Sequence, residues 1–169
     1  MKNILEAINL SCEKGEKILF NKVNLRLESH QILLVIGQNG SGKTSLLRQL
    51  CGLSYLGQGD IRWNSHSVQE NKTNYFKELV YIGHQHGIKT HLTAMENLVL
   101  DMALRGKINN LLVEQAIQKV GLIQQKKLLA RFLSSGQARR LALARLVIFK
   151  VPIWILDEPL IGLDASALS

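Results

Sequence analysis

The feature that most constrains this chain is one glycine-rich stretch, Gly37-Gln38-Asn39-Gly40-Ser41-Gly42-Lys43-Thr44, which matches the pattern G-x-x-x-x-G-K-[ST]. A continuous apolar run at residues 32–36 precedes it and predicts a buried parallel strand. Residues 45–50 follow with helical spacing of their leucines, and Gly52 is placed to end that helix. A strand, a glycine loop and a helix in this order predict a Walker A phosphate loop in an α/β domain.

The loop has the donors that a nucleoside triphosphate requires. Its glycines let the backbone approach closely, so that successive N–H groups point at phosphate oxygens, and the helix that starts near Ser45 adds the positive end of its dipole. The ammonium of Lys43 is predicted to reach the β- and γ-phosphates, and the hydroxyl of Thr44 to bind Mg²⁺. The expected ligands are therefore ATP and Mg²⁺, and residues 37–44 together with Ser45 are expected to contact the nucleotide.

Hydrophobic patterning predicts the remaining elements. Short strands are expected at residues 5–10, 23–27, 57–63 and 79–82. Gly15 lies in the turn between the first two, which alternate apolar and polar residues as half-buried strands do. Helices are expected to start at Thr93, at Asn109 or Asn110, and near Gly136, the first of them with a capping box to Glu96. A buried strand at 151–156 follows.

Composition narrows the class of protein. A chain of 169 residues suits one domain, and no apolar stretch approaches the about 20 residues that cross a bilayer. Two cysteines are too few for a disulfide framework, which indicates a reduced, cytoplasmic setting. The net charge of +8 favours anionic partners, but no Lys/Arg run exceeds two residues and aromatics make up only 5%. Nucleic acid is therefore not indicated as a partner.

A second motif follows the last predicted strand. Asp157 and Glu158 come directly after the apolar residues 153–156, which is typical of a Walker B strand. At the strand tip, Asp157 can hold Mg²⁺ through water. Glu158 is then placed to polarise the attacking water and is the predicted catalytic residue.

A third motif makes the resemblance specific. Leu133-Ser134-Ser135-Gly136-Gln137 resembles the LSGGQ signature of ABC ATPases, with Ser135 where the family has its first glycine. The resemblance implies a head-to-tail, ATP-dependent homodimer in which Ser134, Ser135, Gly136 and Gln137 face the phosphate loop of the other copy. Because the motif lies at a helix start, Ser135 and the Gly136 amide can donate to a γ-phosphate.

Two smaller matches agree with this family. Gln85 follows the strand at 79–82, where the family has the Q-loop glutamine that touches Mg²⁺ and the attacking water. Asp164, within Ile161-Gly162-Leu163-Asp164, resembles the D-loop acid. The implied fold is a P-loop NTPase of the ABC-ATPase type over residues 1–169, with an N-terminal antiparallel β part and a helical subdomain at about 86–145.

Further stretches resemble the ATP-binding subunits of the cytochrome c maturation haem exporter (the CcmA type). They include Tyr81-Ile82-Gly83-His84-Gln85, Gly87-Ile88-Lys89-Thr90 and Trp154-Ile155-Leu156-Asp157-Glu158-Pro159. This resemblance implies a peripheral ATPase on the cytoplasmic face of the inner membrane. Its partners would be an integral membrane subunit and the cytochrome c maturation apparatus, with haem export or release of a haem chaperone as the work done. His84, His86 and His91 lack a Cys or carboxylate to complete a metal site and are expected to be loop residues.

Two features depart from the family pattern. No aromatic residue stands near residues 10–17 to stack on adenine, and the family's switch histidine would lie beyond Ser169. The chain is therefore expected to be truncated at its C-terminal end and to turn over slowly. The alternatives are an ABC-type ATPase of another transporter, a soluble ABC protein acting on nucleic acid, and an ATP-binding module without hydrolysis.

Overall fold

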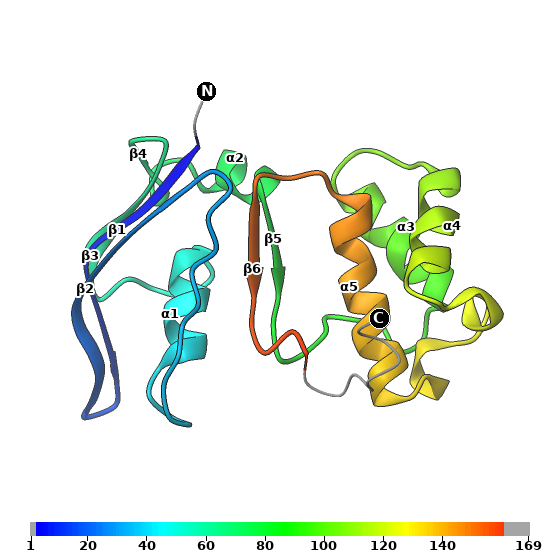
Figure 1. Ribbon diagram of the computed structural model, residues 1–169, viewed down its shortest axis with the longest axis horizontal. Helices are drawn as coiled ribbons and strands as arrows, with labels where there is room; N and C mark the ends of the chain where they lie inside the picture. The colour runs from blue at the N-terminus through cyan, green and yellow to red at the C-terminus, as the bar shows by residue number, and fades with distance from the viewer. Residues whose placement is uncertain (1–2, 161–169) are drawn as a thin grey trace. The chain divides into compact units, whose positions relative to one another are not determined.

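The structure, a computed structural model, describes residues 3–160. The chain divides into two compact units, Met1–Leu79 and Val80–Ser169. The first unit contains an antiparallel sheet, the phosphate loop and the helix that follows it (Figure 1). The second contains a helical cluster with the signature and the acidic motif, so each unit carries its own part of the predicted chemistry.

The sheet of the first unit has the order β2-β1-β3-β4. Its strands are β1 (Ile4–Lys14), β2 (Lys17–Glu28), β3 (Gln58–Trp63) and β4 (His66–Ser67). All three neighbouring pairs are antiparallel, which confirms the predicted N-terminal antiparallel part. The turn between β1 and β2 contains Gly15 at a left-handed φ of +61°. Leu5 and Ala7 of β1 are buried and Glu6 between them is less so, as the alternating pattern predicts.

Helix α1 (Lys43–Leu50) packs beside this sheet (Figure 1). Leu46 and Leu50 are buried on the helix face toward the core. Gln49 ties the helix to β1, because its buried amide donates to the carbonyl of Ser11 at 3.3 Å. The predicted helix end is confirmed, since Gly52 has a φ of +70° and its N–H donates back to the Gln49 carbonyl.

A short helix, α2 (Lys72–Lys77), fastens the end of the first unit to α1. Tyr75 is 2% exposed, and its hydroxyl donates to the carbonyl of Leu50 at 2.8 Å. Burial raises the pKa of Tyr75 far above its ordinary value, so the hydroxyl remains a donor at any physiological pH.

The predicted strand at residues 32–36 is wrong. The run belongs to neither sheet, and Ile32, Leu34 and Ile36 are 96%, 76% and 82% exposed. Apolar and β-branched residues favour a strand, but a strand also needs a neighbour that satisfies its backbone N–H and C=O groups. The sheet of the first unit pairs β2, β1, β3 and β4 and does not include this segment.

The second unit begins within β5 (Leu79–Ile82), which pairs with β6 (Ile153–Leu156) in a two-stranded sheet. The two strands lie side by side and run in the same direction in Figure 1. In the sequence, the segment from β5 to β6 contains α3 (Ala94–Leu104), α4 (Asn110–Lys119), the 3₁₀ turns η1 (Ile123–Gln125) and η2 (Ala130–Phe132), and α5 (Ser135–Ile148).

Side-chain caps start these helices where the sequence predicts. The hydroxyl of Thr93 accepts from the Glu96 N–H at 3.1 Å, and the Glu96 carboxylate accepts from the Thr93 N–H, which completes a capping box. Asn109, one of the two predicted caps, accepts from the Leu112 N–H. No helix among residues 3–160 is long and apolar enough to span a membrane.

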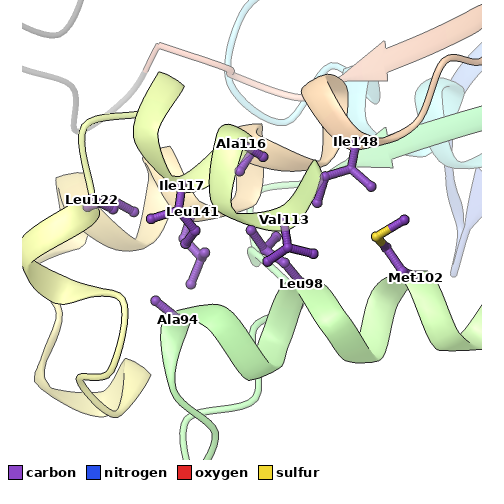
Figure 2. Packing of buried hydrophobic residues seen from close by; sticks show 10 residues of the cluster. Ala94, Leu98, Met102, Val113, Ala116, Ile117, Leu122, Leu141 and Ile148 are labelled. Carbon is purple, nitrogen blue, oxygen red and sulfur yellow. The ribbon is translucent and has the colours of Figure 1, made fainter. Parts of the chain in front are cut away.

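Ten buried residues hold α3, α4 and α5 together (Figure 2). They are Ala94, Leu98, Met102, Val113, Ala116, Ile117, Leu122, Leu141, Ala144 and Ile148. Figure 2 shows these side chains meeting between the three helices. The cluster fixes α5, the helix that begins with the signature, against the rest of the second unit.

The prediction of a buried strand at residues 151–156 is only partly right, since β6 covers Ile153–Leu156. Ile153 and Ile155 are buried, but Trp154 between them is 54% exposed. Within the described residues β6 has one neighbouring strand and one face on the core, so alternate side chains point away.

Candidate functional site

The phosphate loop (residues 37–44) depends on two glycines in left-handed backbone conformations. Gly40 has a φ of +79° and Gly42 a φ of +95°. Gly42 is also the N-cap of α1, and a Cβ there would lie 3.0 Å from the Leu19 Cβ and 3.1 Å from the Phe20 Cδ1. No side chain caps α1, so the first N–H groups of the helix keep no intrahelical acceptor and remain available to an anion.

Lys43 turns back across this loop. Its Nζ donates to the carbonyls of Gly37 at 2.8 Å and Gln38 at 2.9 Å, and the Ser41 N–H closes the loop onto Gln38 at 3.2 Å. The ammonium therefore lies beside the loop N–H groups, and Thr44 is exposed in the first turn of α1. A fixed cation next to unpaired N–H donors is an arrangement that binds phosphate.

The acidic turn (residues 157–159) continues from β6. The Asp157 N–H donates to the Ile82 carbonyl at 2.8 Å, which joins the end of β6 to the end of β5. Asp157 is 3% exposed, and its Oδ2 is buried without a hydrogen-bond partner among the described residues. A buried carboxylate oxygen without a donor is costly, and a bound cation would remove that cost. The chemistry of Asp157 thus fits a metal ligand.

Glu158 is held in an unusual backbone conformation. Its φ is +52°, a left-handed value that few residues with a side chain adopt. Such conformations persist where the surroundings enforce them, and they gather at functional sites. The Glu158 Oε2 lies 3.4 Å from the Nδ1 of His84, and its side chain is 38% exposed. Its carboxylate is therefore accessible, unlike that of Asp157.

The segment after β5 (residues 83–87) lies against the acidic turn in the second unit. Gln85, the predicted Q-loop glutamine, is exposed, and it follows His84, the neighbour of Glu158. His86 is less exposed, and its pKa is lowered first by burial and then by the positive charge of Arg139. His86 is therefore neutral at neutral pH, and its Nδ1 can accept a hydrogen bond.

Two side chains of the signature (residues 133–137) form the N-terminal cap of α5, and another is exposed to solvent. The Ser134 hydroxyl accepts from the Gln137 N–H at 3.2 Å, and the Gln137 Oε1 accepts from the Ser134 N–H at 2.9 Å. This capping box starts α5 and uses both side chains locally. Ser135 is exposed in the first turn beside Gly136, so these two remain the predicted donors to an outside phosphate.

Sequence reasoning missed Arg139, which connects the acidic turn to the segment after β5. Although 2% exposed, it donates to four backbone carbonyls and lies near His86. A signal was present, since Arg139 lies three residues before Ala142 on the face of α5 that is buried. A charged residue on such a face predicts a buried cation with specific partners.

The predicted site residues are thus placed within their own units. The phosphate loop belongs to the first unit, whereas Gln85, the acidic turn and the signature belong to the second. Asp164, the predicted D-loop acid, lies outside the described residues.

Comparisons with known proteins agree with these motifs. The family model described as "ABC transporter" matches residues 20–161. The cytochrome c biogenesis ATP-binding export protein CcmA of Methylococcus capsulatus is 44% identical over 164 residues, 96% of this chain and 79% of that protein. The protein of the same name in Nitrosospira multiformis is 46% identical over 165 residues, which cover 97% of this chain and 80% of that protein.

Among solved structures, the dimeric ATP-binding cassette MJ0796, in a post-hydrolysis state with ADP and Pi, superposes with a TM-score of 0.85 at 22% identity. The match covers 96% of this chain and 77% of that one. At this identity the likeness shows the fold, and it confirms the predicted class: an α/β P-loop NTPase fold of the ABC-ATPase type.

Proposed function

The chain belongs to the ABC transporter family and is an ABC-type ATPase, and from this premise we propose that it drives an exporter that serves cytochrome c biogenesis. Relatives 44% and 46% identical over nearly the whole chain are named for that role. The chemistry proposed is hydrolysis of ATP by water to ADP and phosphate, with haem export or release of a haem chaperone as the work done.

The phosphate loop is the observation that carries the ATPase part of this proposal. A Cβ on Gly42 would lie 3.0 Å from the Leu19 Cβ. No side chain caps the start of α1, so the first N–H groups of the helix remain available to an anion. Lys43 adds an ammonium held by two loop carbonyls. Backbone N–H groups, a helix N-terminus and a lysine together recognise a polyphosphate rather than a single carboxylate.

We propose that Thr44, Gln85 and Asp157 hold the Mg²⁺ that accompanies ATP. The unpartnered Oδ2 of Asp157 supports this choice, because a cation would satisfy it. Mg²⁺ usually takes only one or two carboxylates from a protein and keeps waters and phosphates as its other ligands. That habit agrees with the described residues, where no three His, Cys, Asp or Glu side chains form a metal cluster. Bound magnesium would supply charge neutralisation at the phosphates.

Glu158 is the proposed general base. Its carboxylate would accept a proton from the water that attacks the γ-phosphorus, while Lys43 balances the charge on the phosphate oxygens. The exposed carboxylate and the enforced backbone at φ +52° support this assignment. Ser135 and Gly136 would complete the site from a second copy of the chain in a head-to-tail dimer. The cassette MJ0796, a structural relative, is itself dimeric with ADP and Pi.

The partner on the membrane side is proposed to be an integral membrane subunit, which places this chain at the cytoplasmic face of the inner membrane. Residues 93–132, between Gln85 and the signature, are the proposed dock. Several large apolar side chains in this region are exposed: Leu104, Ile108, Leu111 and Phe132. Crosslinks to a membrane partner should form from this region more often than from residues 1–27, and the reverse pattern would count against this dock.

Haem staining of cytochromes tests the proposal in cells. In a strain that depends on this chain, replacing it with Glu158→Gln should abolish c-type cytochromes with covalently attached haem and leave b-type cytochromes unchanged. Unchanged c-type cytochromes would remove the cytochrome c role. If ATPase activity of the purified chain then rose with RNA, the nucleic-acid alternative would replace it.

A further inference from the structure

The most unusual group outside the predicted machinery is the guanidinium of Arg139 on α5. The residue is 2% exposed, and among the described residues no carboxylate side chain is hydrogen-bonded to it. Burial lowers the pKa of Arg139, whereas the charges of Asp157 and Glu158 raise it. Arginine stays protonated in proteins, so the second unit contains a buried cation whose cost must be met by other acceptors.

Three of those acceptors are consecutive carbonyls of the acidic turn. The Arg139 Nη2 donates to the carbonyls of Asp157 at 2.9 Å and Glu158 at 2.6 Å, and its Nε donates to Pro159 at 3.1 Å. These three carbonyls converge on one planar group at a sharp bend of the backbone. The left-handed φ of Glu158 is that bend, so the guanidinium and the strained conformation are parts of one arrangement.

The Nη1 atom of the Arg139 guanidinium contacts the segment after β5 (residues 83–87). The Arg139 Nη1 donates to the Gly83 carbonyl at 2.9 Å and lies 3.3 Å from the Nδ1 of His86. These two residues flank His84 and Gln85. One side chain therefore holds both the turn that presents Glu158 and the segment that presents Gln85.

Arg139 also connects these loops to a rigid element. It lies two residues after Gln137, whose capping box with Ser134 starts α5. The helix itself is fixed by the buried cluster that contains Leu141, Ala144 and Ile148 (Figure 2). A planar guanidinium has five donors in a rigid arrangement and can hold several acceptors in one geometry, whereas the ammonium of a lysine has three rotatable donors on a flexible stem.

We propose that Arg139 is a positioning residue for hydrolysis, which fixes Glu158 and the Gln85 segment in one arrangement relative to the signature helix. The inference rests on the proposed ATPase function and deepens it. Arg139 touches neither ATP nor water in this scheme and acts only through Glu158 and the segment at 83–87. Its loss should therefore reduce the rate of the chemical step and leave nucleotide affinity intact.

Single-turnover hydrolysis with protein in excess over Mg-ATP tests this. Arg139→Lys and Arg139→Gln should each lower the rate constant by about 10- to 100-fold, because small displacements of reacting groups are that costly. ATP affinity should stay within about twofold, since the hydrogen bonds described within the phosphate loop, from Lys43 to the carbonyls of Gly37 and Gln38, do not involve Arg139. Arg140→Gln is the matched control. Within residues 3–160, Arg140 donates to the carbonyls of Val120 and Gly121, at 3.3 and 3.5 Å, and to neither the acidic turn nor the segment at 83–87, so this variant should keep the wild-type rate.

Non-additivity separates positioning from general loss of fold. In a Glu158→Gln background, adding Arg139→Lys should change the rate by less than about twofold, because the group that it positions is already absent. Amide exchange of residues 157–160 should accelerate in Arg139→Lys, with exchange in α1 unchanged. This second measurement tests the proposal even if Arg139→Gln fails to fold.

Two outcomes would overturn the proposal while the ATPase function stands: a wild-type rate in Arg139→Lys and Arg139→Gln, or a full 10- to 100-fold loss added on top of Glu158→Gln. The wild type and Glu158→Gln alone report on the proposed function. If their rates are equal, the function itself fails and the inference falls with it.

Discussion

The backbone conformations of the phosphate loop and of the acidic turn are fixed by different kinds of contact. The phosphate loop is shaped mainly from within eight residues, by left-handed glycines and by a lysine that folds back onto its own loop carbonyls. The acidic turn is shaped from a distance, because Arg139 lies 18 to 20 residues away in the chain from the carbonyls that it holds. The conformation of the phosphate loop depends mainly on neighbouring residues in the sequence, whereas that of the acidic turn depends on the folded structure around it.

Removing the buried charge of the acidic turn should have the largest effect. Asp157→Asn should lower Mg-ATP turnover by about a hundredfold or more, because the proposed magnesium ligand is lost. The free energy of unfolding of the nucleotide-free protein should stay within about 1 kcal/mol of the wild type, because the amide relieves the unpartnered Oδ2 but removes the attraction to the Arg139 guanidinium. Phosphate release and chemical unfolding on the same preparations measure both. A destabilised variant with normal turnover would show that Asp157 is only structural.

Removing the lysine charge of the phosphate loop should weaken the binding of ATP. Lys43→Ala should weaken ATP binding by about 10- to 100-fold, as expected when charged hydrogen bonds worth about 1.5–3 kcal/mol are lost. Titration with a fluorescent ATP analogue measures it, with Lys72→Ala, in the exposed α2, as the control. Equal affinity in the wild type and Lys43→Ala would remove the phosphate-loop assignment.

The left-handed backbone and the close packing at Gly42 predict a smaller, purely structural effect. Gly42→Ala should cost about 2–3 kcal/mol, since it combines a left-handed backbone with contact to Leu19 and Phe20. Gly15→Ala is the matched control in the same unit: its φ is also positive but nothing lies within 4 Å of the added Cβ, so about 1 kcal/mol is expected. Equal losses of unfolding free energy would mean that close packing at Gly42 does not shape the loop.

The smallest effect is expected at the start of α5. Ser134→Ala removes the acceptor of the Gln137 N–H and should destabilise the protein by about 1 kcal/mol. Ser135→Ala, at the exposed neighbour, should be close to neutral in the absence of nucleotide. Thermal unfolding of the two variants compares them, and the reverse ranking would show that the cap is not at Ser134.

The same contrast explains what the sequence could predict. Helix starts at Thr93 and Asn109 and the helix end at Gly52 were predictable, because caps depend on a few neighbouring residues. The strand at residues 32–36 was predicted wrongly, since its formation depends on a partner that no local pattern specifies.

Some features of the candidate site could likewise be predicted from the sequence, and others could not. The phosphate loop, the acidic pair and the capping box at Ser134 could be identified from short motifs. The role of Arg139 could not, because its partners lie in segments far along the chain on both sides. The orphaned Oδ2 of Asp157 is likewise a property of the folded environment rather than of the motif.

The measurement that tests the central claim most directly is ATP binding and single-turnover hydrolysis of the wild type and Glu158→Gln, side by side on the same preparations. The account predicts equal ATP affinity, a rate at least about a hundredfold lower in the variant, and an ATP-bound dimer that accumulates only in the variant. An unchanged rate in Glu158→Gln would contradict the claim that this chain hydrolyses ATP through its acidic turn.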